Sequence, residues 1–475
     1  MAQRYFPDNE YHALIVGSGG REHALAWALR RSPRLNLLLY CPNNENGNPA
    51  MDLLPDTERC SQLTHEIDHI VELTQYVLPD LIIIGPEAPL AAGLADKIER
   101  IGLGLMVLGP TQAGARLESS KQWAKEFMTR WQIPTAHAET FDTLERALDY
   151  LEAAPAPFVL KADGLAAGKG VLVTEDRVEA KKFAHQVMAQ KIFGNAGARL
   201  LIEEFMQGQE VSVLALCDTV SNTIVPLEPA CDYKRAYDYD LGPNTGGMGA
   251  YSPTFVMTQA MRERVQREIL EPTLGGLRAE KINYRGILYA GLMITSSGPK
   301  VVEYNVRMGD PETQSLLPRL KTDLLEVLDL LAHGKLSEAP PLEWDIRPSC
   351  GVVLTAPGYP GAYPKGLPIY GLENFPLNPT PDDLLLFHAG TTPLNAGEFL
   401  SNSISFPWDE EPKVIDSHYY QANPVLTDGG RVFNLVALGA TLAEAQQRVY
   451  SVLEQNKFGF EGMYFRRDIA EREIK

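Results

Sequence analysis

The chain has 475 residues, 45% of them hydrophobic and 22% charged, which is the composition of a globular protein with several domains of roughly 100–200 residues each. Its formal net charge of −18 argues against binding to nucleic acid, because phosphate backbones are bound by clustered Lys and Arg. Small anions remain candidate ligands, since local cations and helix N-termini can hold them.

The five cysteines are scattered without Cys-x-x-Cys spacing, which favours free thiols in a reducing compartment over a disulfide framework or a zinc site. The first residues contain no apolar signal core, and no uninterrupted apolar run approaches the ~18 residues of a membrane span. The sequence therefore predicts a soluble protein of the cytoplasm that contacts no membrane.

The N-terminal segment alternates apolar strands with helices. Strand 12–16 runs into the glycine-rich turn 17–23, whose backbone N–H groups could approach an anion at the start of a helix predicted over 24–30. A dinucleotide-binding fold would have a third glycine where Glu22 stands, and an acid where the next strand ends at Cys41. Nicotinamide binding is therefore disfavoured.

The same pattern recurs at strands 81–84 and 105–108, each of which ends in a glycine–proline turn. Alternating strands and helices predict an open parallel sheet with right-handed crossovers, whose ligands bind at the carboxyl ends of the strands. Each glycine could serve only a tight turn, but four loops meeting at one edge favour a small anionic substrate. These loops are 17–23, 41–48, 85–90 and 109–114.

Residues 158–173 are predicted to form a strand, a glycine-rich loop and a second strand. The loop is no Walker A motif, because only three residues separate Gly164 from Gly168 and a strand rather than a helix follows. We expect a hairpin whose tip carries Lys169 over bound phosphates, while Lys161 points inward and needs an anionic partner. A plain hairpin without a ligand is the alternative.

Two further lysines, Lys121 and Lys125, lie four residues apart on one face of a helix predicted over 117–131, a pattern that usually marks a solvated face. Strand 198–206 then leaves its sheet through a turn containing Glu210. Its backbone groups could bind a nucleobase edge with Glu210 near the ribose, although acids at turns are usually solvated.

The run 232–251 is long, polar and glycine-rich, which predicts either a functional or a disordered loop. Within it, Lys234 and Arg235 can bind a carboxylate or a phosphate, and the glycines of 246–249 offer backbone donors to an anion.

The most informative stretch is 300–312. Apolar and polar residues alternate, which predicts a half-buried strand with Glu303, Asn305 and Arg307 on one face. A carboxylate and an amide two residues apart supply oxygen ligands for Mg²⁺, and Arg307 could bind a phosphate or carboxylate beside the metal. A solvent-facing polar strand is the alternative. The strand exit carries Gly309, Asp310, Pro311 and Glu312.

From about residue 340 the composition becomes richer in Pro and Gly. Strands are predicted at 350–355 and 431–439, and a helix at 441–454 begins with a capping box of Thr441 and Glu444. We expect a small α+β lobe with few candidate catalytic groups. A segment without a clear period lies between 391 and 425.

Five motifs of this chain resemble those of the phosphoribosylamine–glycine ligase family of the ATP-grasp superfamily, over about 12–390 and 425–470. The lysine loop and the metal strand alone are typical of ATP-grasp proteins in general, whereas the Gly-Pro-Asn-Thr-Gly-Gly-Met-Gly run is specific to this family. The motifs lie at 17–24, 85–90, 161–170, 242–249 and 307–313.

The resemblance implies a ligase of de novo purine synthesis that joins glycine to 5-phosphoribosylamine. ATP, a substrate, would be cleaved to ADP and phosphate through a glycyl phosphate intermediate, with Mg²⁺ or Mn²⁺ as cofactor. The implied partners are these small molecules alone, with no nucleic acid and no membrane, and the implied state is a monomer or weak dimer.

The family's site residues carry over onto matching positions of this chain. Glu303 and Asn305 would ligate the metal, and Arg307, Lys234 and Asp232 would be catalytic. The residues implied to bind ATP are Lys121, Lys161, Lys169, Glu203, Glu204, Phe205 and Glu210. Those implied to bind the other substrates are Gly19, Gly20, Arg21, Glu22, Glu87, Arg235, Asn244, Thr245, Gly246, Gly247, Asp310, Pro311 and Glu312.

The fold class is therefore expected to be multidomain, mixed α/β and α+β, with an open parallel sheet of the pre-ATP-grasp type, a central ATP-grasp fold and a small C-terminal α+β lobe. The expected N-terminal domain covers 1–117, on the phosphoribosylamine side. The ATP-grasp domain covers 118–335, with a lid subdomain at about 134–206. The C-terminal domain covers 336–475, with an insertion at about 392–424.

Three departures from the family pattern affect these expectations: Tyr233 stands where a histidine is usual, Pro42-Asn43-Asn44 replaces Pro-Gly-Asn, and 392–424 is long. Two other functions remain open. One is another ATP-grasp carboxylate–amine ligase or a carboxylase acting on a purine precursor, and the other is a non-catalytic scaffold that binds nucleotide. None of the departures removes an implied metal ligand or phosphate-facing lysine.

Overall fold

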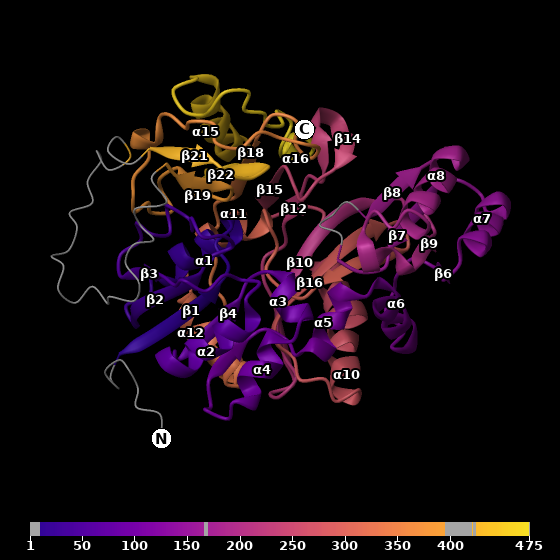
Figure 1. The fold of residues 1–475 in the computed structure, drawn as a ribbon, viewed down its shortest axis with the longest axis horizontal. Coiled ribbons are helices and arrows are strands. Elements are labelled where there is room, and N and C mark those ends of the chain that lie inside the picture. Colours follow the sequence, from indigo (N-terminus) through magenta and orange to yellow (C-terminus); the bar gives the residue numbers. More distant parts are fainter. Residues whose placement is uncertain (1–9, 166–169, 395–419, 421–423, 475) are drawn as a thin grey trace.

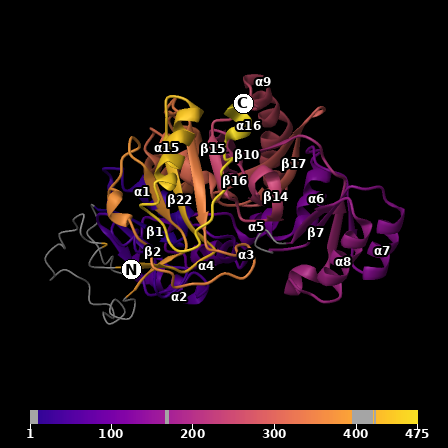
Figure 2. The same cartoon turned by 90° about the horizontal axis from the view of Figure 1, so that it is seen from above.

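The structure is a computed structural model that describes residues 10–165, 170–394, 420 and 424–474. Figure 1 shows a parallel sheet near the N-terminus, two antiparallel central sheets and a C-terminal sheet, and Figure 2 shows the same units from above. The mixed α/β architecture confirms the expected fold class. Within the described residues, every helix is too short or too polar to span a lipid bilayer.

The N-terminal unit is a five-stranded sheet in the order β3-β2-β1-β4-β5 with every pairing parallel. Its inner strands β1 and β4 are buried along nearly their whole length and, after His12, consist of aliphatic residues, as is typical of a parallel sheet covered on both faces. The strands are β1 (Tyr11–Val16), β2 (Leu35–Cys41), β3 (Thr57–Arg59), β4 (Leu81–Ile84) and β5 (Met106–Leu108). The helices are α1 (Gly20–Leu29), α2 (Ile67–Val77), α3 (Glu87–Ala91), α4 (Leu94–Arg100) and α5 (Gln112–Ser119).

The central part of the chain forms two four-stranded antiparallel sheets, in the orders β6-β9-β7-β8 and β11-β10-β16-β17. The first contains β6 (Ala138–Phe141), β7 (Phe158–Ala162), β8 (Val171–Thr174) and β9 (Leu200–Glu203), with α7 (Leu144–Ala153) and α8 (Arg177–Met188). The second contains β10 (Gln209–Asp218), β11 (Thr223–Pro226), β16 (Arg285–Thr295) and β17 (Gly298–Asn305), with α6 (Lys121–Arg130), α9 (Gln259–Val265) and α10 (Glu271–Ala279).

The C-terminal unit is a five-stranded antiparallel sheet in the order β12-β15-β18-β22-β19. Its strands are β12 (Cys231–Asp232), β15 (Gly249–Ser252), β18 (Ser349–Thr355), β19 (Leu385–His388) and β22 (Arg431–Leu438). Nearby are the two-stranded pairs β13 (Arg235–Tyr237) with β14 (Leu241–Asn244) and β20 (Thr391–Pro393) with β21 (Val425–Thr427). The helices are α11 (Glu312–Leu316), α12 (Leu324–Ala332), α15 (Leu442–Glu454) and α16 (Glu471–Ile474).

Two strands of the C-terminal sheet, β12 and β15, lie at the two ends of the glycine-rich run 232–251. The run is therefore not one long loop. Edge strand β12 pairs with β15, and β15 pairs with β18 through the register Ala250↔Gly351. The run is folded as four short strands because its backbone groups find partners in this sheet and in the β13–β14 pair.

Two helix boundaries differ from the sequence prediction. Helix α1 begins at Gly20, so the motif residues that follow Gly20 form its first turn and are not a separate loop. The helix expected over 117–131 is broken at Ser120, whose extended backbone ends α5 and whose hydroxyl caps α6 by accepting from the N–H of Trp123. The break places Lys121 at the start of α6.

A shared apolar core joins the units. It includes residues of the N-terminal sheet, of β10 and β16, of α12 and of β19. At the contact between α1 and β19, the backbone N–H of His388 donates to Nδ1 of His23 at 3.0 Å. Burial lowers the pKa of His23 to about 3 and the pKa of His388 well below its usual value.

This contact predicts an acid-sensitive fold. The pKa of His23 is about 6.5 in the unfolded chain and lower in the folded one, so the unfolded chain gains its proton first and stability is lost as the pH falls from 6.5 toward 3. We expect His23→Gln, which keeps an acceptor, to remove up to about 1.4 kcal/mol per pH unit of this dependence. Urea midpoints at pH 7 and pH 4.5 measure it, with exposed His137→Gln as the control.

Candidate active site

The strand β17 presents its polar residues to one side, as the alternation predicts. A bulge at Val302 shifts its register against β16, so Val301, Tyr304 and Val306 are buried in the core. Glu303 and Asn305 lie on the opposite face, where Nη2 of Arg307 is 3.4 Å from Oδ1 of Asn305. A carboxylate, an amide oxygen and a guanidinium are thereby gathered on one face.

Four cationic side chains surround the carboxylate of Glu303. Burial alone would raise the pKa of Glu303, but Lys234, Lys161, Lys121 and Arg307 together lower it below its usual value. The carboxylate is therefore held ionised inside the protein.

Lys161 on β7 is buried, and it forms a lysine cluster with Lys121, Lys125 and Lys234. Its Nζ is 3.0 Å from Oε2 of Glu203 and donates to the carbonyl of Val302 at 3.0 Å. Burial alone would lower the pKa of Lys161, but Glu203 and Glu303 raise it above its usual value. The expectation that this lysine points inward and meets an anionic partner is confirmed.

The same glutamate has a second lysine partner that the sequence did not single out. Nζ of Lys125 is 3.3 Å from Oε2 of Glu203 and donates to Thr135 Oγ1 and to the carbonyl of Ala136. Burial lowers the pKa of Lys125 to about 8, against the opposing effect of Glu203. One carboxylate oxygen of Glu203 thus lies within 3.3 Å of the amino groups of two lysines.

Lys234 lies on the other side of Glu303. Its Nζ is 2.8 Å from Oδ2 of Asp232 and 3.8 Å from Oε2 of Glu210. Burial alone would lower the pKa of Lys234, but Asp232 raises it well above its usual value. Burial raises the pKa of Glu210. Side chains of Lys234 and Asp232 meet because residues two apart on an extended chain share a face.

Tyr233, between them, points the other way. Its ring is covered by the guanidinium groups of Arg466, 4.6 Å from the ring centroid, and Arg472, 4.2 Å from it. The ring therefore packs against the C-terminal segment.

Arg307 joins β17 to the N-terminal unit. Its Nε is 3.3 Å from Oε2 of Glu87 and its Nη2 is 2.9 Å from Oε1 of Glu118. Glu118 also accepts from the N–H of Val306 at 2.8 Å. Burial alone would lower the pKa of Arg307, but Glu118 and Glu87 raise it.

The glycine-rich turn after β1 is organised around Glu22. Its carboxylate accepts from the N–H of Gly19 at 2.9 Å and from Nε of Arg21 at 2.7 Å. A Cβ at Gly17 would lie 2.6 Å from Cγ of Glu22, and one at Gly85 would also clash with this side chain. Glu22 thus ties the loop after β1 to the loop after β4, and neither glycine has room for a side chain.

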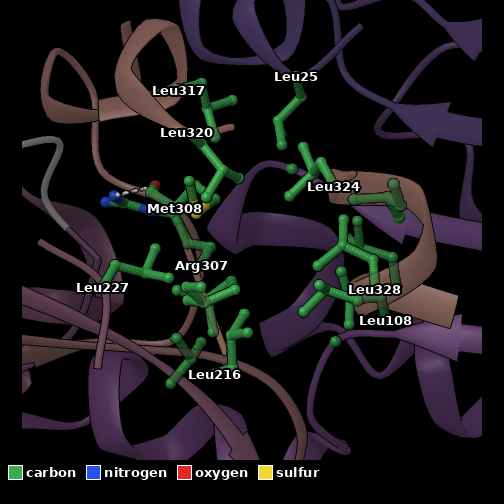
Figure 3. A pocket seen from close by; sticks show the side chains of 18 residues that line it. Leu25, Leu108, Leu216, Leu227, Arg307, Met308, Leu317, Leu320, Leu324 and Leu328 are labelled. Atoms are coloured by element: carbon green, nitrogen blue, oxygen red, sulfur yellow. Dashed lines mark hydrogen bonds between the residues drawn. The ribbon is translucent and has the colours of Figure 1, made fainter. Parts of the chain in front are cut away.

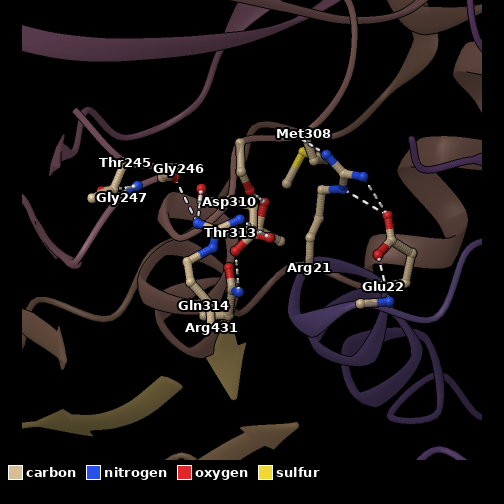
Figure 4. Close-up of polar contacts among 12 residues, drawn as sticks. Arg21, Glu22, Thr245, Gly246, Gly247, Met308, Asp310, Thr313, Gln314 and Arg431 are labelled. Atoms are coloured by element: carbon tan, nitrogen blue, oxygen red, sulfur yellow. Dashed lines mark hydrogen bonds and ion pairs between the residues drawn. The ribbon is translucent and has the colours of Figure 1, made fainter. Parts of the chain in front are cut away.

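The turn that follows β17 meets the glycine-rich run at a point shown in Figure 4. Nη2 of Arg431 is 2.8 Å from Oδ2 of Asp310, and its Nη1 donates to the carbonyls of Gly246 at 2.6 Å and Asp310 at 2.8 Å. Glu312 is buried and accepts from Tyr289 at 2.9 Å and from Ser212 at 3.1 Å.

Other implied residues lie further from this centre or outside the described part. Glu204 pairs with Lys300 at 3.0 Å, and Phe205 is 47% exposed. Arg235 contacts the carbonyl of Asp240 and Oδ1 of Asn244 within the β13–β14 pair. Lys169, at the expected hairpin tip, lies outside the described residues, although strands β7 and β8 pair as predicted.

An apolar cavity lies beside the turn at Arg307 and Met308 (Figure 3). Apart from Arg307, Met308 and two glycines, its lining is aliphatic side chains, among them residues of the N-terminal sheet, β10, β16 and α12. Such a lining offers a nucleotide or a sugar phosphate a single charged partner, so the polar face of β17 is the better candidate for the reaction site.

Sequence reasoning missed three residues that the structure brings into the site: Lys125, Glu118 and Arg431. Lys125 was visible through its four-residue spacing from Lys121 but resembled a solvated face. Glu118 and Arg431 gave no local signal, because each contacts a segment more than a hundred residues away.

Comparison with known proteins defines the class. A family model for the ATP-grasp (A) domain of phosphoribosylglycinamide synthetase matches residues 119–313, which contain the lysine cluster and the β17 face, so the protein is an ATP-grasp enzyme. Models for the N and C domains match residues 11–118 and 349–472. The chain belongs to the phosphoribosylglycinamide synthetase family.

Individual relatives agree with this assignment over nearly the whole chain. The phosphoribosylamine–glycine ligase of Vibrio cholerae is 43% identical over 464 residues, covering 97% of this chain and 98% of the relative. That of Salmonella typhimurium is 42% identical over 463 residues, with coverages of 97% and 98%.

Solved structures extend the comparison to the fold. Phosphoribosylamine–glycine ligase of Thermotoga maritima superposes with a TM-score of 0.75 at 31% identity, covering 97% of this chain and all of that one. The biotin carboxylase domain of a 2-oxoglutarate carboxylase from Hydrogenobacter thermophilus, in complex with MgADP and bicarbonate, gives a TM-score of 0.68 at 15% identity, with 98% coverage of both chains. The second likeness shows a common fold alone.

Lys161 and Lys125 both contact Glu203, but the pKa of Lys161 is raised and that of Lys125 is lowered, so removing each lysine should have a different effect. Lys161→Met leaves the buried Glu203 without its nearer partner, so we expect it to lower the thermal midpoint at pH 7 more than Lys125→Met does. The pKa of Lys125 is lower in the folded chain, so wild-type protein should gain stability between about pH 8 and 10.5, at up to about 1.4 kcal/mol per pH unit.

Denaturant midpoints between about pH 8 and 10.5 measure this gain in stability. Lys125→Met should lack the share of the gain that comes from Lys125. An equal alkaline gain in wild type and Lys125→Met would contradict the assignment.

Proposed function

We propose that the protein joins glycine to 5-phosphoribosylamine, with cleavage of ATP to ADP and phosphate, to give glycinamide ribonucleotide. The observation that carries the proposal is the face of β17 with Glu303 and Asn305, beside which the buried Lys161 contacts the carbonyl of Val302 and Glu203, within a segment that the family's ATP-grasp model matches. Phosphoryl transfer needs few covalent groups from the protein, and depends on cations placed where negative charge spreads and on reactants held in line.

The donor set of β17 fits a magnesium ion. Glu303 and Asn305 supply two hard oxygen ligands, and in the described part of the chain no group of three or more His, Cys, Asp or Glu could hold a metal. Such a pair suits Mg²⁺, or Mn²⁺, because Mg²⁺ takes one or two protein carboxylates and completes its shell with substrate phosphates and water. A bound Mg²⁺ would neutralise charge on the triphosphate.

The roles of the surrounding side chains follow from their charge and position. Lys121 and Lys161 would bind ATP phosphates, and Lys169 would contact them from the hairpin tip. Glu203, Glu204 and Phe205 would line the adenine pocket, with Glu210 on the ribose. Their positions beside β7, β9 and β10, next to the metal face, support this assignment.

The remaining groups would hold the two other substrates. Lys234, Asp232, Arg235 and the run 244–247 would face glycine and the transferred phosphoryl group. The loops of the N-terminal unit, with Arg21, Glu87 and the Arg307–Glu312 turn, would hold phosphoribosylamine, as expected for an N-terminal domain on that side.

In this reaction the amino group of phosphoribosylamine attacks glycyl phosphate. Formation of the acyl phosphate moves the γ-phosphoryl group from ATP to the glycine carboxylate, and the attack then expels phosphate and forms the amide. Lys234 and Arg307 would compensate the charge on the carboxylate and phosphate oxygens. Water must be excluded because it would hydrolyse the acyl phosphate, and closure of the β7–β8 hairpin would provide that exclusion.

We expect the release of ADP to require both glycine and phosphoribosylamine. An assay of ADP with each substrate omitted in turn tests this. ADP formed with bicarbonate alone would favour a carboxylase, and nucleotide binding without turnover would favour a scaffold.

Loss of Glu303 should abolish turnover without unfolding the protein. We expect Glu303→Ala to lower kcat by several orders of magnitude, because a metal ligand and a site of charge balance are both lost. The thermal midpoint reports folding, and Glu139→Ala, which changes an exposed glutamate of β6, is the matched control. Turnover within a few-fold of wild type would place the metal elsewhere.

A further inference from the structure

Arg431 is the first residue of β22, in the C-terminal sheet, yet its guanidinium lies among residues of two other segments (Figure 4). It contacts three acceptors: the carboxylate of Asp310 at 2.8 Å, the carbonyl of Asp310 at 2.8 Å and the carbonyl of Gly246 at 2.6 Å. One planar group therefore spans the turn after β17 and the glycine-rich run, since its two Nη atoms can reach acceptors on both.

The glycine-rich run is packed against this arginine without spare room. A Cβ at Gly246 would lie 2.9 Å from Cζ of Arg431. Gly247 has a φ of +113° and would clash with Pro311 if it carried a side chain. The two glycines thus allow the run to lie directly on Arg431 and on the turn.

The turn itself is fixed from more than one side. The second carboxylate oxygen of Asp310 accepts from Nε2 of Gln314 at 2.8 Å. The carbonyl of Met308 accepts from Arg21 of the N-terminal unit at 3.2 Å and from Arg307 at 3.1 Å. The turn is therefore contacted by Arg431 from the C-terminal unit and by Arg21 from the N-terminal unit.

Charge keeps the Arg431–Asp310 pair together. Burial alone would raise the pKa of Asp310, but Arg431, Arg21 and Arg307 lower it. Burial alone would lower the pKa of Arg431, but Asp310 raises it. The pair is half-buried, and it is costly to break because removing one partner leaves the other charge partly desolvated and unpaired.

We propose that Arg431 is a positioning residue of the ligase reaction, which fixes the run 245–247 against the Asp310 turn. Lys234 is tied to that run, because its carbonyl accepts from the N–H of Thr245 at 2.7 Å, and Arg307 begins the turn. The inference rests on the proposed function, in which these two segments face glycine and phosphoribosylamine. Arg431 thus keeps the acyl phosphate and the attacking amine aligned.

The experiment compares Arg431→Lys and Arg431→Ala with Arg448→Ala. Arg448 donates to two carbonyls inside the C-terminal unit, those of Leu438 and Asp382, and is the matched control. We expect kcat/KM for phosphoribosylamine to fall about 10²-fold in Arg431→Lys, because small misplacements of reacting groups have effects of that size, while the Kd for MgATP changes less than threefold. Arg448→Ala should keep both values.

Added guanidinium ion should restore part of the activity of Arg431→Ala, and none should return in Arg431→Lys. If Arg431→Ala fails to fold, Arg431→Lys is used instead, in a double-mutant cycle with Asp310→Asn. We expect the effects of the two substitutions on kcat/KM to be non-additive, because the two side chains contact each other. The proposal would be overturned if kcat/KM of Arg431→Lys stayed within threefold of wild type. It would also be overturned if Arg448→Ala lost as much kcat/KM as Arg431→Lys.

Hydrogen exchange separates this inference from the proposed function, because it needs no substrate. We expect the amides of 244–249 to exchange faster in Arg431→Lys than in wild type, and to be unchanged in Arg448→Ala. Faster exchange in Arg431→Lys, combined with a wild-type protein that lacks ligase activity, would refute the function alone. Unchanged exchange would refute the positioning role.

Discussion

The site depends on the balance of charge around the half-buried carboxylate of Glu303. Partial burial raises the pKa of a carboxylate, yet Lys234, Lys161, Lys121 and Arg307 lower the pKa of this one and so favour its ionised form. The cations are in turn kept in place by other acids, among them Glu203. Lys125 shares Glu203 with Lys161, and burial lowers the pKa of Lys125 to about 8, so the negative charge of a polyphosphate nearby would stabilise its protonated form.

The architecture brings these charges together from four sheets. Lys161 comes from the sheet of β7, Glu303 from that of β17, Asp232 from β12, and Glu87 from the first position of α3, just after β4 of the N-terminal sheet. Lys161 and Glu303 are paired residues within their strands, so the sheets themselves fix where these two charges lie. A site at the junction of several units can change shape as they move, which suits a reaction that must exclude water after its substrates enter.

The sequence predicts those parts of the site that depend on local pattern. Alternation placed Glu303, Asn305 and Arg307 on one face, and the apolar strand around Lys161 indicated a buried lysine. Pairing between distant segments has no local signature, so the union of β15 with β18 and the contact of Arg431 with Asp310 were not predictable. The break at Ser120 was missed because the residues on both sides favour a helix.

Tyr233 lies on the opposite side of the backbone from Asp232 and Lys234, its neighbours in the sequence. Asp232 and Lys234 face the site and contact each other, and an extended chain sends the residue between them to the opposite side. There Tyr233 lies between Arg466 and Arg472, whose charges its ring can accommodate through its electron-rich face. A change from the usual histidine therefore alters the contact with the C-terminal segment and leaves the reacting face intact, since neither Asp232 nor Lys234 depends on that side chain for a hydrogen bond.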